Sequence, residues 1–345
     1  MTDTAAQPEP LISVRNLVKE FPFGKGRLLK RNAATVQAVS GVSFDIGERE
    51  TLGLVGESGS GKTTTGRALL RLHEPTSGSI RYRDQELTEL SRSAMRDVRK
   101  DLQIVFQDPF ASLNPKLPIN DIIGEAFVIH DDISTKERLD RVSQLLVDVG
   151  LRPEHGNRYP HEFSGGQRQR IGIARALSLE PKFIVLDEPV SALDVSVQAG
   201  VINLLDELQD ERGIAYLFIA HDLSVVRHVS NRVAVMYLGK LVEVGDRKSL
   251  FRAPTHPYTQ ALMSAVPVPD PRRERTRKRI VLEGDIPSPI SPPSGCRFRT
   301  RCWRATDLCA EEEPELVERT PGLYSACHHP IETDVELAAS GGAAQ

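Results

Sequence analysis

The sequence has few features that would place the chain across a membrane or in the secretory pathway. It contains no apolar run close to the roughly 18 residues that a membrane-spanning helix requires, so any membrane association is expected to be peripheral. Residues 1–8 have neither a basic start nor an apolar core, which excludes a secretion signal and favours a cytosolic setting. The formal net charge of -3 argues neither for nor against nucleic acid as the main partner.

Cysteine is scarce and unevenly placed. The 345 residues include 4 cysteines, and all of them follow residue 295. In a reducing compartment they are not expected to form disulfides. Charged residues make up 26% of the chain and apolar residues 39%, which is typical of a soluble globular protein, and the length allows one large or two medium domains.

One glycine-rich stretch fits the phosphate-binding pattern G-x-x-x-x-G-K-[ST]. It follows the apolar run 51–55 and precedes the helix-compatible segment 65–70, which is the context that the motif requires. Glycines let backbone N–H groups turn toward a phosphate chain, and the following helix presents the positive end of its dipole. We expect Lys62 to reach the terminal phosphates and Thr63 to hold Mg²⁺, although a glycine-rich turn without a ligand is the alternative. The residues of this predicted phosphate-binding loop are Gly56, Glu57, Ser58, Gly59, Ser60, Gly61, Lys62, Thr63 and Thr64.

The hydrophobic pattern predicts an α/β chain with a helical insertion. Helical periodicity over 119–150, ending at Gly150, predicts the insertion, and residues 23–32 are predicted to form a loop. Strands are predicted at 11–18, 42–46, 78–82, 101–106, 183–187 and 214–219, with a closing hairpin at 232–237 and 240–244 turned at Leu238 and Gly239, and further helices at 168–179 and 197–212.

Polar side chains follow two of the predicted buried strands. Asp187 and Glu188 come directly after an apolar run, and His221 follows the next one along the chain. Because parallel sheets place ligands at the carboxyl ends of their strands, the acidic pair is in position for Mg²⁺ and a water molecule, and His221 is a site candidate. Solvated loop carboxylates and a structural histidine are the alternatives.

Two further features stay ambiguous in the sequence. Ser164, Gly165, Gly166 and Gln167 open the predicted helix at 168–179, either as an anion-binding site or as a plain N-cap. Phe21, just before the loop at 23–32, either stacks on an adenine ring or belongs to the core.

The composition changes after about residue 265, where proline becomes frequent and residues 272–279 are strongly basic. This predicts a linker and then a small accessory domain, with the basic run as solvated linker or as a contact for anionic lipid head groups. The spacing C-x5-C-x6-C-x17-C lacks the tight C-x2–4-C pairs of structural zinc, whereas four thiolates can also hold an iron–sulfur cluster. The four cysteines are Cys296, Cys302, Cys309 and Cys327.

Five elements in fixed order resemble the nucleotide-binding cassette of ABC ATPases over roughly residues 11–250. They are the phosphate-binding loop, Gln107, the stretch 164–167, the acidic pair with Asp194 behind it, and His221. The stretches 107–115 and 255–262 and the cysteine-bearing tail further resemble the peptide and nickel importer subfamily. The resemblance implies an α/β P-loop NTPase fold, with a cassette at 11–265 and a helical subdomain near 108–176. The polar, proline-containing residues 1–10 are predicted to form a flexible tail, and the change in composition places the linker and accessory domain at 266–345.

The resemblance also implies roles for individual residues on ATP. Phosphoryl transfer needs positioning and charge neutralisation, which residues of these types supply. The implied roles are adenine stacking for Phe21, sensing of Mg²⁺ and water for Gln107, water-mediated Mg²⁺ binding for Asp187, general base for Glu188, γ-phosphate contact for His221 and signalling across a dimer interface for Asp194. Ser164, Gly165 and Gly166 would cap the opposite cassette's γ-phosphate, and Gln167 is counted with them among the nucleotide-binding residues.

The function implied by the resemblance is ATP hydrolysis that powers an importer of di- or oligopeptides. It implies a second ATPase subunit, two transmembrane permease subunits that dock on the helical insertion, an extracytoplasmic solute-binding protein acting indirectly, and a peripheral place on the cytoplasmic face of the membrane, with no nucleic acid. A 4Fe-4S cluster is expected on the cysteines, with zinc as the alternative. Import of nickel or another small solute, a soluble ABC ATPase of DNA repair or translation, and a non-catalytic regulatory cassette remain competing hypotheses.

Overall fold

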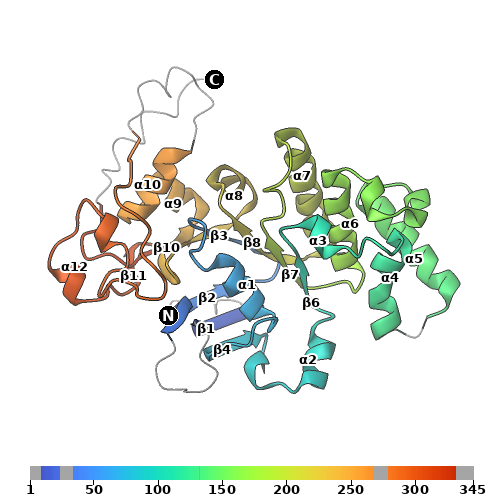
Figure 1. The fold of residues 1–345 in the computed structure, drawn as a ribbon, viewed down its shortest axis with the longest axis horizontal. Coiled ribbons are helices and arrows are strands. Elements are labelled where there is room, and N and C mark those ends of the chain that lie inside the picture. The colour runs from blue at the N-terminus through green and yellow to red at the C-terminus, as the bar shows by residue number, and fades with distance from the viewer. Residues whose placement is uncertain (1–8, 24–33, 132, 267–278, 332–345) are drawn as a thin grey trace, which may run out of the picture. The chain divides into compact units, whose positions relative to one another are not determined.

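The computed structural model describes residues 9–23, 34–131, 133–266 and 279–331 (Figure 1). The chain forms two compact units, each assembled from segments that are distant in sequence. The first consists of Met1–Ile12, Asp45–Thr51 and Arg81–Ile219, and the second of Ser13–Phe44, Leu52–Ile80 and Ala220–Gln345. Residues 1–8 of the predicted tail and 272–278 of the basic run lie outside the described residues.

Three parallel strands form the sheet of the first unit. β7 (Phe183–Asp187) pairs on one edge with β6 (Leu102–Val105) and on the other with β8 (Ala215–Ala220). Every residue of β7 and β8 is buried, as expected for continuous apolar runs in a parallel sheet covered on both faces. The strands predicted at 183–187 and 214–219 are thereby confirmed, and their carboxyl ends carry the polar residues of interest.

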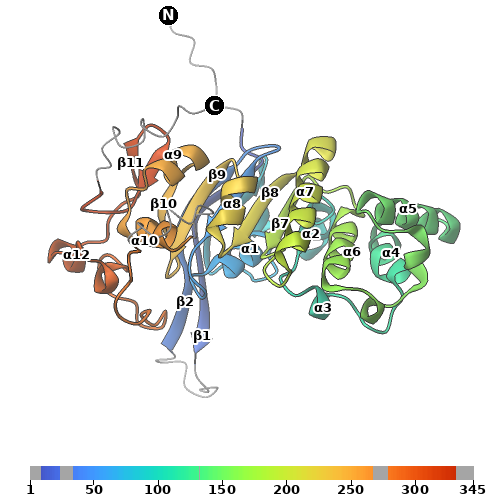
Figure 2. The same ribbon diagram turned by 90° about the horizontal axis from the view of Figure 1, so that it is seen from above.

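Helices α4 (Ile119–His130), α5 (Thr135–Asp148) and α6 (Gly165–Leu177) pack against one another in the first unit (Figures 1 and 2). The helical periodicity over 119–150 therefore corresponds to two helices. The predicted start of the next helix at residue 168 was wrong by three residues, because a cap at Ser164 lets α6 begin at Gly165. The other elements of this unit are β5 (Gln85–Glu86), η1 (Leu87–Glu89), α2 (Arg92–Val98), α3 (Pro109–Ser112), η2 (Pro153–Asn157), η3 (Pro160–Glu162) and α7 (Val195–Arg212).

The second unit contains a mixed sheet. β3 (Thr51–Val55) runs parallel to β9 (Arg232–Tyr237), which pairs antiparallel with β10 (Lys240–Asp246). The turn at Leu238 and Gly239 has positive φ at both residues, which confirms the predicted closing hairpin. β12 (Leu323–Ser325) and β11 (Val317–Thr320) extend the sheet beyond β10.

A smaller sheet runs in the order β2 (Ala34–Ile46), β1 (Ile12–Phe23), β4 (Ser77–Tyr82). β1 continues to Phe23, so the prediction that the loop begins at that residue was wrong, because main-chain pairing with neighbouring strands extends β1 past its alternating stretch. The remaining elements of the second unit are α1 (Lys62–Leu69), α8 (Leu223–Val229), α9 (Arg247–Arg252), α10 (Pro257–Ala265), η4 (Arg299–Arg301) and α12 (Leu308–Glu311).

Candidate functional site

The phosphate-binding loop joins the fully buried strand β3 to helix α1 and depends on its glycines. Gly56, Gly59 and Gly61 all have positive φ. A Cβ on Gly56 would lie 2.1 Å from the carbonyl oxygen of Met236, and one on Gly61 would lie 2.2 Å from that of Ala38. Since both obstacles are backbone atoms, only glycine fits, and the loop holds its path before any ligand arrives.

Lys62 is buried at the start of α1 and folds back over the loop. Its Nζ donates to the carbonyl oxygens of Gly56 at 2.8 Å and Glu57 at 2.9 Å. Thr63 follows it in the first helical turn, where N–H groups have no partner inside the helix. Positive charge and N–H donors thus gather at this loop, an arrangement suited to binding phosphates.

Phe21 lies half-exposed on β1, so it is not a core residue. Its ring meets His73 edge-on, with 5.4 Å between centroids, and the Lys19 Nζ lies 4.8 Å from its centroid. Burial, reinforced by Arg67 and Lys19, lowers the pKa of His73. A partly exposed aromatic ring beside cations is compatible with the predicted stacking on a base.

Gln107 and Glu188 meet at the carboxyl ends of two adjacent strands. Gln107 follows β6, Glu188 follows β7, and the Gln107 Nε2 donates to the Glu188 Oε2 at 2.8 Å. Asp187, the last residue of β7, is 1% exposed. Sequence reasoning predicted both Gln107 and Glu188, yet their contact spans 81 positions and has no local signature.

The backbone of Glu188 is in the left-handed region, with φ of 47°. Its N–H donates to the carbonyl oxygen of Ile219 at 3.0 Å, which holds the residue in this conformation. Such a conformation is unfavourable for a non-glycine residue and is often found where a side chain is aimed at a reaction. The sequence did not indicate this backbone conformation, and the contact that orients the Glu188 carboxylate is the hydrogen bond from Gln107.

Ser164 caps α6 through a reciprocal pair of hydrogen bonds with Gln167. The Gln167 N–H donates to the Ser164 Oγ at 3.4 Å, and the Ser164 N–H donates to the Gln167 Oε1 at 3.0 Å. Ser164 and Gly165 are exposed, whereas Gly166 is buried against Val197. The N-cap geometry is thus present, and the exposed part of the cap remains accessible to a ligand.

Asp194 and His221 both lie at the starts of helical segments. Asp194 occupies the N-cap position of α7 and is exposed, next to Val195, which is 82% exposed. His221 follows β8 directly and is exposed, while Asp222 caps α8. The position of His221 at the carboxyl end of its strand agrees with the sequence prediction.

The four cysteines influence one another electrostatically. Burial raises the pKa of the Cys296 thiol to about 11, and the thiols of Cys309, Cys327 and Cys302 add to the rise. Burial likewise raises the pKa of the Cys327 thiol to about 11, again with contributions from neighbouring thiols. The cysteines therefore gather in one region, but within the described residues no group of three or more His, Cys, Asp or Glu is arranged to hold a metal ion.

Two residues outside the predicted set contact the phosphate-binding loop within the second unit. The Tyr258 hydroxyl accepts a hydrogen bond from the Glu57 N–H at 2.8 Å, and the Arg301 guanidinium binds the Glu57 carboxylate. Tyr258 lies in the stretch 255–262 that the sequence singled out, but nothing local in the sequence pointed to Arg301.

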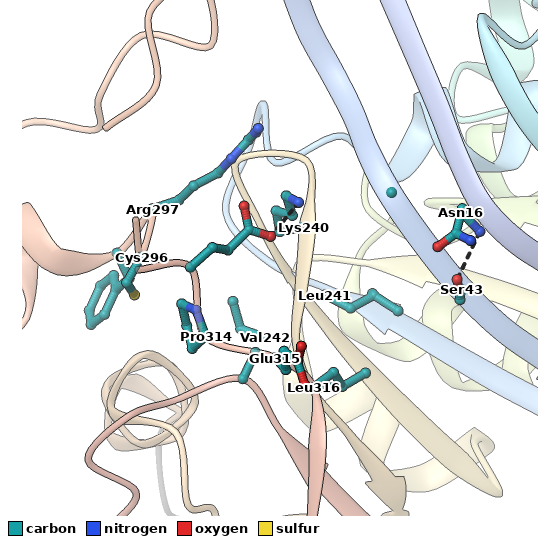
Figure 3. Close-up of a pocket in the computed structure, with 14 residues that line it drawn as sticks. Asn16, Ser43, Lys240, Leu241, Val242, Cys296, Arg297, Pro314, Glu315 and Leu316 are labelled. Atoms are coloured by element: carbon teal, nitrogen blue, oxygen red, sulfur yellow. Dashed lines mark hydrogen bonds and ion pairs between the residues drawn. The ribbon is translucent and has the colours of Figure 1, made fainter. Parts of the chain in front are cut away.

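A cavity of about 310 Å³ lies beside Cys296 and Arg297 (Figure 3). The Lys240 Nζ and the Glu313 Oε1 form an ion pair of 2.5 Å along its wall. Arg297 points toward the β1–β2 side of the unit, where it donates to the Gln37 Oε1 at 2.7 Å. These contacts join the cysteine-bearing segment to the rest of the second unit.

The described part of the chain includes no helix both long and apolar enough to cross a lipid bilayer.

Comparisons with known proteins agree with this geometry. The family profile described as ABC transporter matches residues 39–191, and the profile described as the C-terminal region of oligopeptide/dipeptide transporters matches residues 242–309. The oligopeptide transport ATP-binding protein AppF of Bacillus subtilis is 54% identical over 94% of this chain and 99% of its own. The dipeptide transport ATP-binding protein DppF of Haemophilus influenzae is 49% identical over 95% of this chain and 99% of its own.

Solved structures with a similar fold cover about two thirds of the chain. The dimeric ATP-binding cassette MJ0796 in a post-hydrolysis state with ADP and phosphate superimposes with a TM-score of 0.61 and 27% identity, over 68% of this chain and 98% of its own. CbiO1 from Clostridium perfringens, part of the ABC transporter complex cbiONQ, gives a TM-score of 0.60 and 26% identity over 71% of this chain and 91% of its own.

Proposed function

Because the chain belongs to the ATP-binding proteins of the ABC transporter family, in its oligopeptide/dipeptide branch, we propose that it hydrolyses ATP to power the import of di- or oligopeptides. The observation that chiefly supports the catalytic part is the 2.8 Å hydrogen bond between Gln107 and a left-handed Glu188. A carboxylate in this position is suited to orienting and deprotonating an attacking water.

The other site residues receive roles that fit their chemistry. Lys62 and the loop N–H groups neutralise phosphate charge. Thr63 and Gln107, with Asp187 acting through water, would hold Mg²⁺, which would stabilise negative charge on the transferred group. His221 contacts the γ-phosphate. Phe21 stacks on adenine. These assignments are supported by the residue types and by family membership.

The catalytic proposal is tested by Glu188→Gln. We expect ATP turnover of the assembled transporter to fall by about 10² to 10⁴-fold, the usual contribution of a general base, while ATP binding persists. Glu180→Gln is the matched control, because Glu180 also has a left-handed backbone, with φ of 51°, and is exposed. Unchanged turnover in Glu188→Gln would assign the base to another residue and favour a regulatory cassette.

A single chain carries one cassette, so we assign it a second ABC ATPase subunit as partner. Support comes from the exposed cap at Ser164 and Gly165, and from the dimeric arrangement of the cassette MJ0796. Ser164, Gly165, Gly166 and Gln167 act on the nucleotide of the opposite cassette, and Asp194 communicates across that interface. Cross-linking of purified complexes with ATP present measures this pairing.

Peripheral attachment to the cytoplasmic face of the membrane follows from docking on permease subunits. We assign residues 11–265 to the cassette, the helical subdomain near 108–176 to permease docking, and 266–345 to the linker and accessory domain. The family profile at 39–191 lies within the proposed cassette, whereas the profile at 242–309 begins in the cassette and continues into the proposed C-terminal part. Co-purification with integral membrane proteins is expected, whereas co-sedimentation with ribosomes or DNA would favour the soluble ATPase alternative.

The transported solute is proposed from the relatives' printed functions in peptide transport. Uptake of labelled peptides in a strain that lacks this subunit tests it, with re-introduction of the chain as the control. Loss of peptide uptake that returns with the chain is the expected result. Unchanged peptide uptake with loss of nickel uptake would reassign the solute.

We also propose that the four cysteines take up a 4Fe-4S cluster, with zinc as the alternative. Four cysteine thiolates can bind either a 4Fe-4S cluster or zinc. The thiols affect one another's pKa values, which supports their lying near one another. Thiols with raised pKa values are protonated at neutral pH, so uptake should release protons. Visible charge-transfer absorbance with analysis for iron, sulfide and zinc decides between cluster, zinc and no metal.

A further inference from the structure

We propose that the C-terminal cysteine-bearing segment positions the phosphate-binding loop, and that Arg301 is the positioning residue through which it does so. The inference rests on the proposed ATP-binding role of that loop. Arg301 and the loop residue that it contacts, Glu57, are 244 positions apart in the chain, and both lie in the second unit.

The contact between Arg301 and Glu57 is a two-point ion pair. The Arg301 Nη1 lies 2.7 Å from the Glu57 Oε2, and the Nη2 lies 3.3 Å from the Glu57 Oε1. The Arg301 side chain is 8% exposed and that of Glu57 25% exposed, so water screens the pair only weakly. A planar guanidinium that binds both carboxylate oxygens fixes direction as well as distance.

Glu57 is also held through its main chain. Its N–H donates to the Tyr258 hydroxyl, whose ring packs against Phe298 with centroids 5.3 Å apart. Phe298 belongs to the same segment as Arg301, and Tyr237 packs against both rings. The cluster of Tyr237, Tyr258 and Phe298 thus lies next to both groups that bind Glu57. The Tyr258 hydroxyl binds the main-chain N–H of Glu57, and the Arg301 guanidinium binds its carboxylate.

Because Glu57 is held at these two points, it also fixes the position of Lys62, the residue proposed to bind the phosphates. Its carbonyl oxygen and that of Gly56 accept the hydrogen bonds of the Lys62 Nζ. A rotation of residue 57 would therefore move both an N–H group of the loop and the anchor of Lys62. Position 57 is the link between the C-terminal segment and the bound phosphates.

Arg301 also neutralises the negative charge that Glu57 adds to the phosphate-binding loop. An acidic side chain in a loop that receives a polyanion repels its ligand unless a cation neutralises it. The Arg301 guanidinium, which stays charged in proteins, neutralises the Glu57 carboxylate through the two-point ion pair. Removing Arg301 would leave the Glu57 carboxylate exposed to the incoming phosphates.

Coupling of this kind acts in both directions. If the C-terminal segment favours the ATP-binding form of the loop, bound ATP must stabilise the segment to the same extent. The N–H groups of Arg301 and Cys302 donate to the carbonyl oxygens of Phe298 and Arg299, so their hydrogen exchange reports on the segment whether or not its thiols hold a metal. ATP should therefore slow amide hydrogen exchange at residues 299–302.

The test compares Arg301→Leu with Arg299→Leu in the full chain. Arg299 lies in the same turn, but its side chain binds Ser294 and not the phosphate-binding loop. Arg299→Leu therefore removes an equal charge and leaves the contacts of the loop in place. We expect Arg301→Leu to weaken MgATP binding about tenfold, Arg301→Lys to recover part of it, and Arg299→Leu to match wild type. In the assembled transporter the change should appear in KM for ATP more than in kcat.

Two further measurements separate positioning from general instability. In a Glu57→Gln background the added Arg301→Leu should cost much less than it does alone, because the charge that it neutralises is gone. ATP should slow amide hydrogen exchange at residues 299–302, followed by mass spectrometry, in wild type and Arg299→Leu but not in Arg301→Leu. If Arg301→Leu fails to fold, Arg301→Lys and the hydrogen exchange of wild type carry the test.

The outcomes distinguish this inference from the proposed function. A wild-type chain that does not bind MgATP would overturn the function itself. A wild-type chain that binds ATP, with Arg301→Leu binding equally well or with hydrogen exchange at residues 299–302 unaffected by ATP, would overturn the inference alone.

Discussion

The two glycine-containing loops that precede helices α1 and α6 differ in what surrounds and binds their backbone. The phosphate-binding loop is enclosed by backbone and side chains of its own unit, and its lysine is buried. At the other loop Ser164 and Gly165 are exposed, and the N–H groups of Ser164 and Gln167 are bound by each other's side chains. The first loop is suited to holding a ligand within its own unit, whereas the second already has two N–H groups paired and presents its cap to a ligand carried by another molecule.

The largest expected effect comes from Gly61→Ala in the enclosed loop. The added Cβ would lie 2.2 Å from the backbone oxygen of Ala38, at a residue with φ of 107°, so neither clash nor strain can relax locally. We expect ATP affinity of the single chain to fall by at least roughly 10²-fold, comparable to the loss of key charge-stabilising groups. Isothermal titration with MgATP measures it.

Gly166→Ala in the exposed loop supplies the matched control. Its Cβ would meet the Val197 Cγ1 at 2.3 Å, which is a side-chain atom. Adding Val197→Ala should therefore restore the stability that Gly166→Ala loses, whereas truncating a side chain should not rescue Gly61→Ala. If Gly61→Ala binds ATP like wild type, the loop is less constrained than its glycines indicate.

A smaller effect is expected from the histidine that supports the enclosed loop. His256 caps α10, its Nδ1 accepting from the Tyr258 N–H at 3.1 Å, and burial lowers its pKa to about 3. Since the unfolded chain binds this proton near pH 6.5, stability is full above that pH and falls as the pH drops toward 3. Near pH 4.5 the loss is roughly 2 to 3 kcal/mol for this group.

His256→Asn keeps a capping acceptor but removes the titration. Denaturant unfolding at several pH values should show a weaker loss of stability between pH 6.5 and 4.5 in this variant than in wild type. His228→Asn, at an exposed position, is the control substitution and is measured over the same pH range. Equal pH slopes for His256→Asn and wild type would mean that the folded chain can protonate His256 without cost.

The smallest effect is expected from Ser164→Ala in the exposed loop. Loss of the cap costs about 1 kcal/mol of stability, but nucleotide binding by the single chain should stay within about twofold of wild type. ATP turnover of the assembled transporter should nevertheless fall about tenfold, since one hydrogen-bond donor to the nucleotide is lost. Malachite-green phosphate release measures turnover.

Ser134→Ala controls for the cap itself, because the Ser134 Oγ caps α5 by accepting from the Glu137 N–H at 3.2 Å. It should lose similar stability while turnover is kept. Should both variants lose turnover equally, the role of Ser164 would be purely structural, and the contrast between the two loops would disappear.

Much of the architecture could be predicted from local pattern alone. Continuous apolar runs identified β7 and β8, and the glycine spacing identified the phosphate-binding loop in its strand and helix context. The spacing of Ser164 and Gln167 is that of a capping box, and it is the local signal that marks the start of α6.

The contacts that aim and hold the site residues could not be predicted in this way. The left-handed backbone of Glu188 depends on a hydrogen bond to Ile219, and Arg301 reaches Glu57 across 244 positions. Neither leaves a periodic or compositional trace, because each depends on how distant segments of one unit pack. Sequence patterns thus identified the reacting groups but not the residues that orient them.

The self-contained cap of α6 has a consequence for how the working complex forms. Because the N–H groups at Ser164 and Gln167 already have partners, this part of a newly made chain needs no folding step when it meets another subunit. In the proposed pairing with a second cassette, this cap would meet its partner as a preformed surface, so that chain ordering at this point would not slow association.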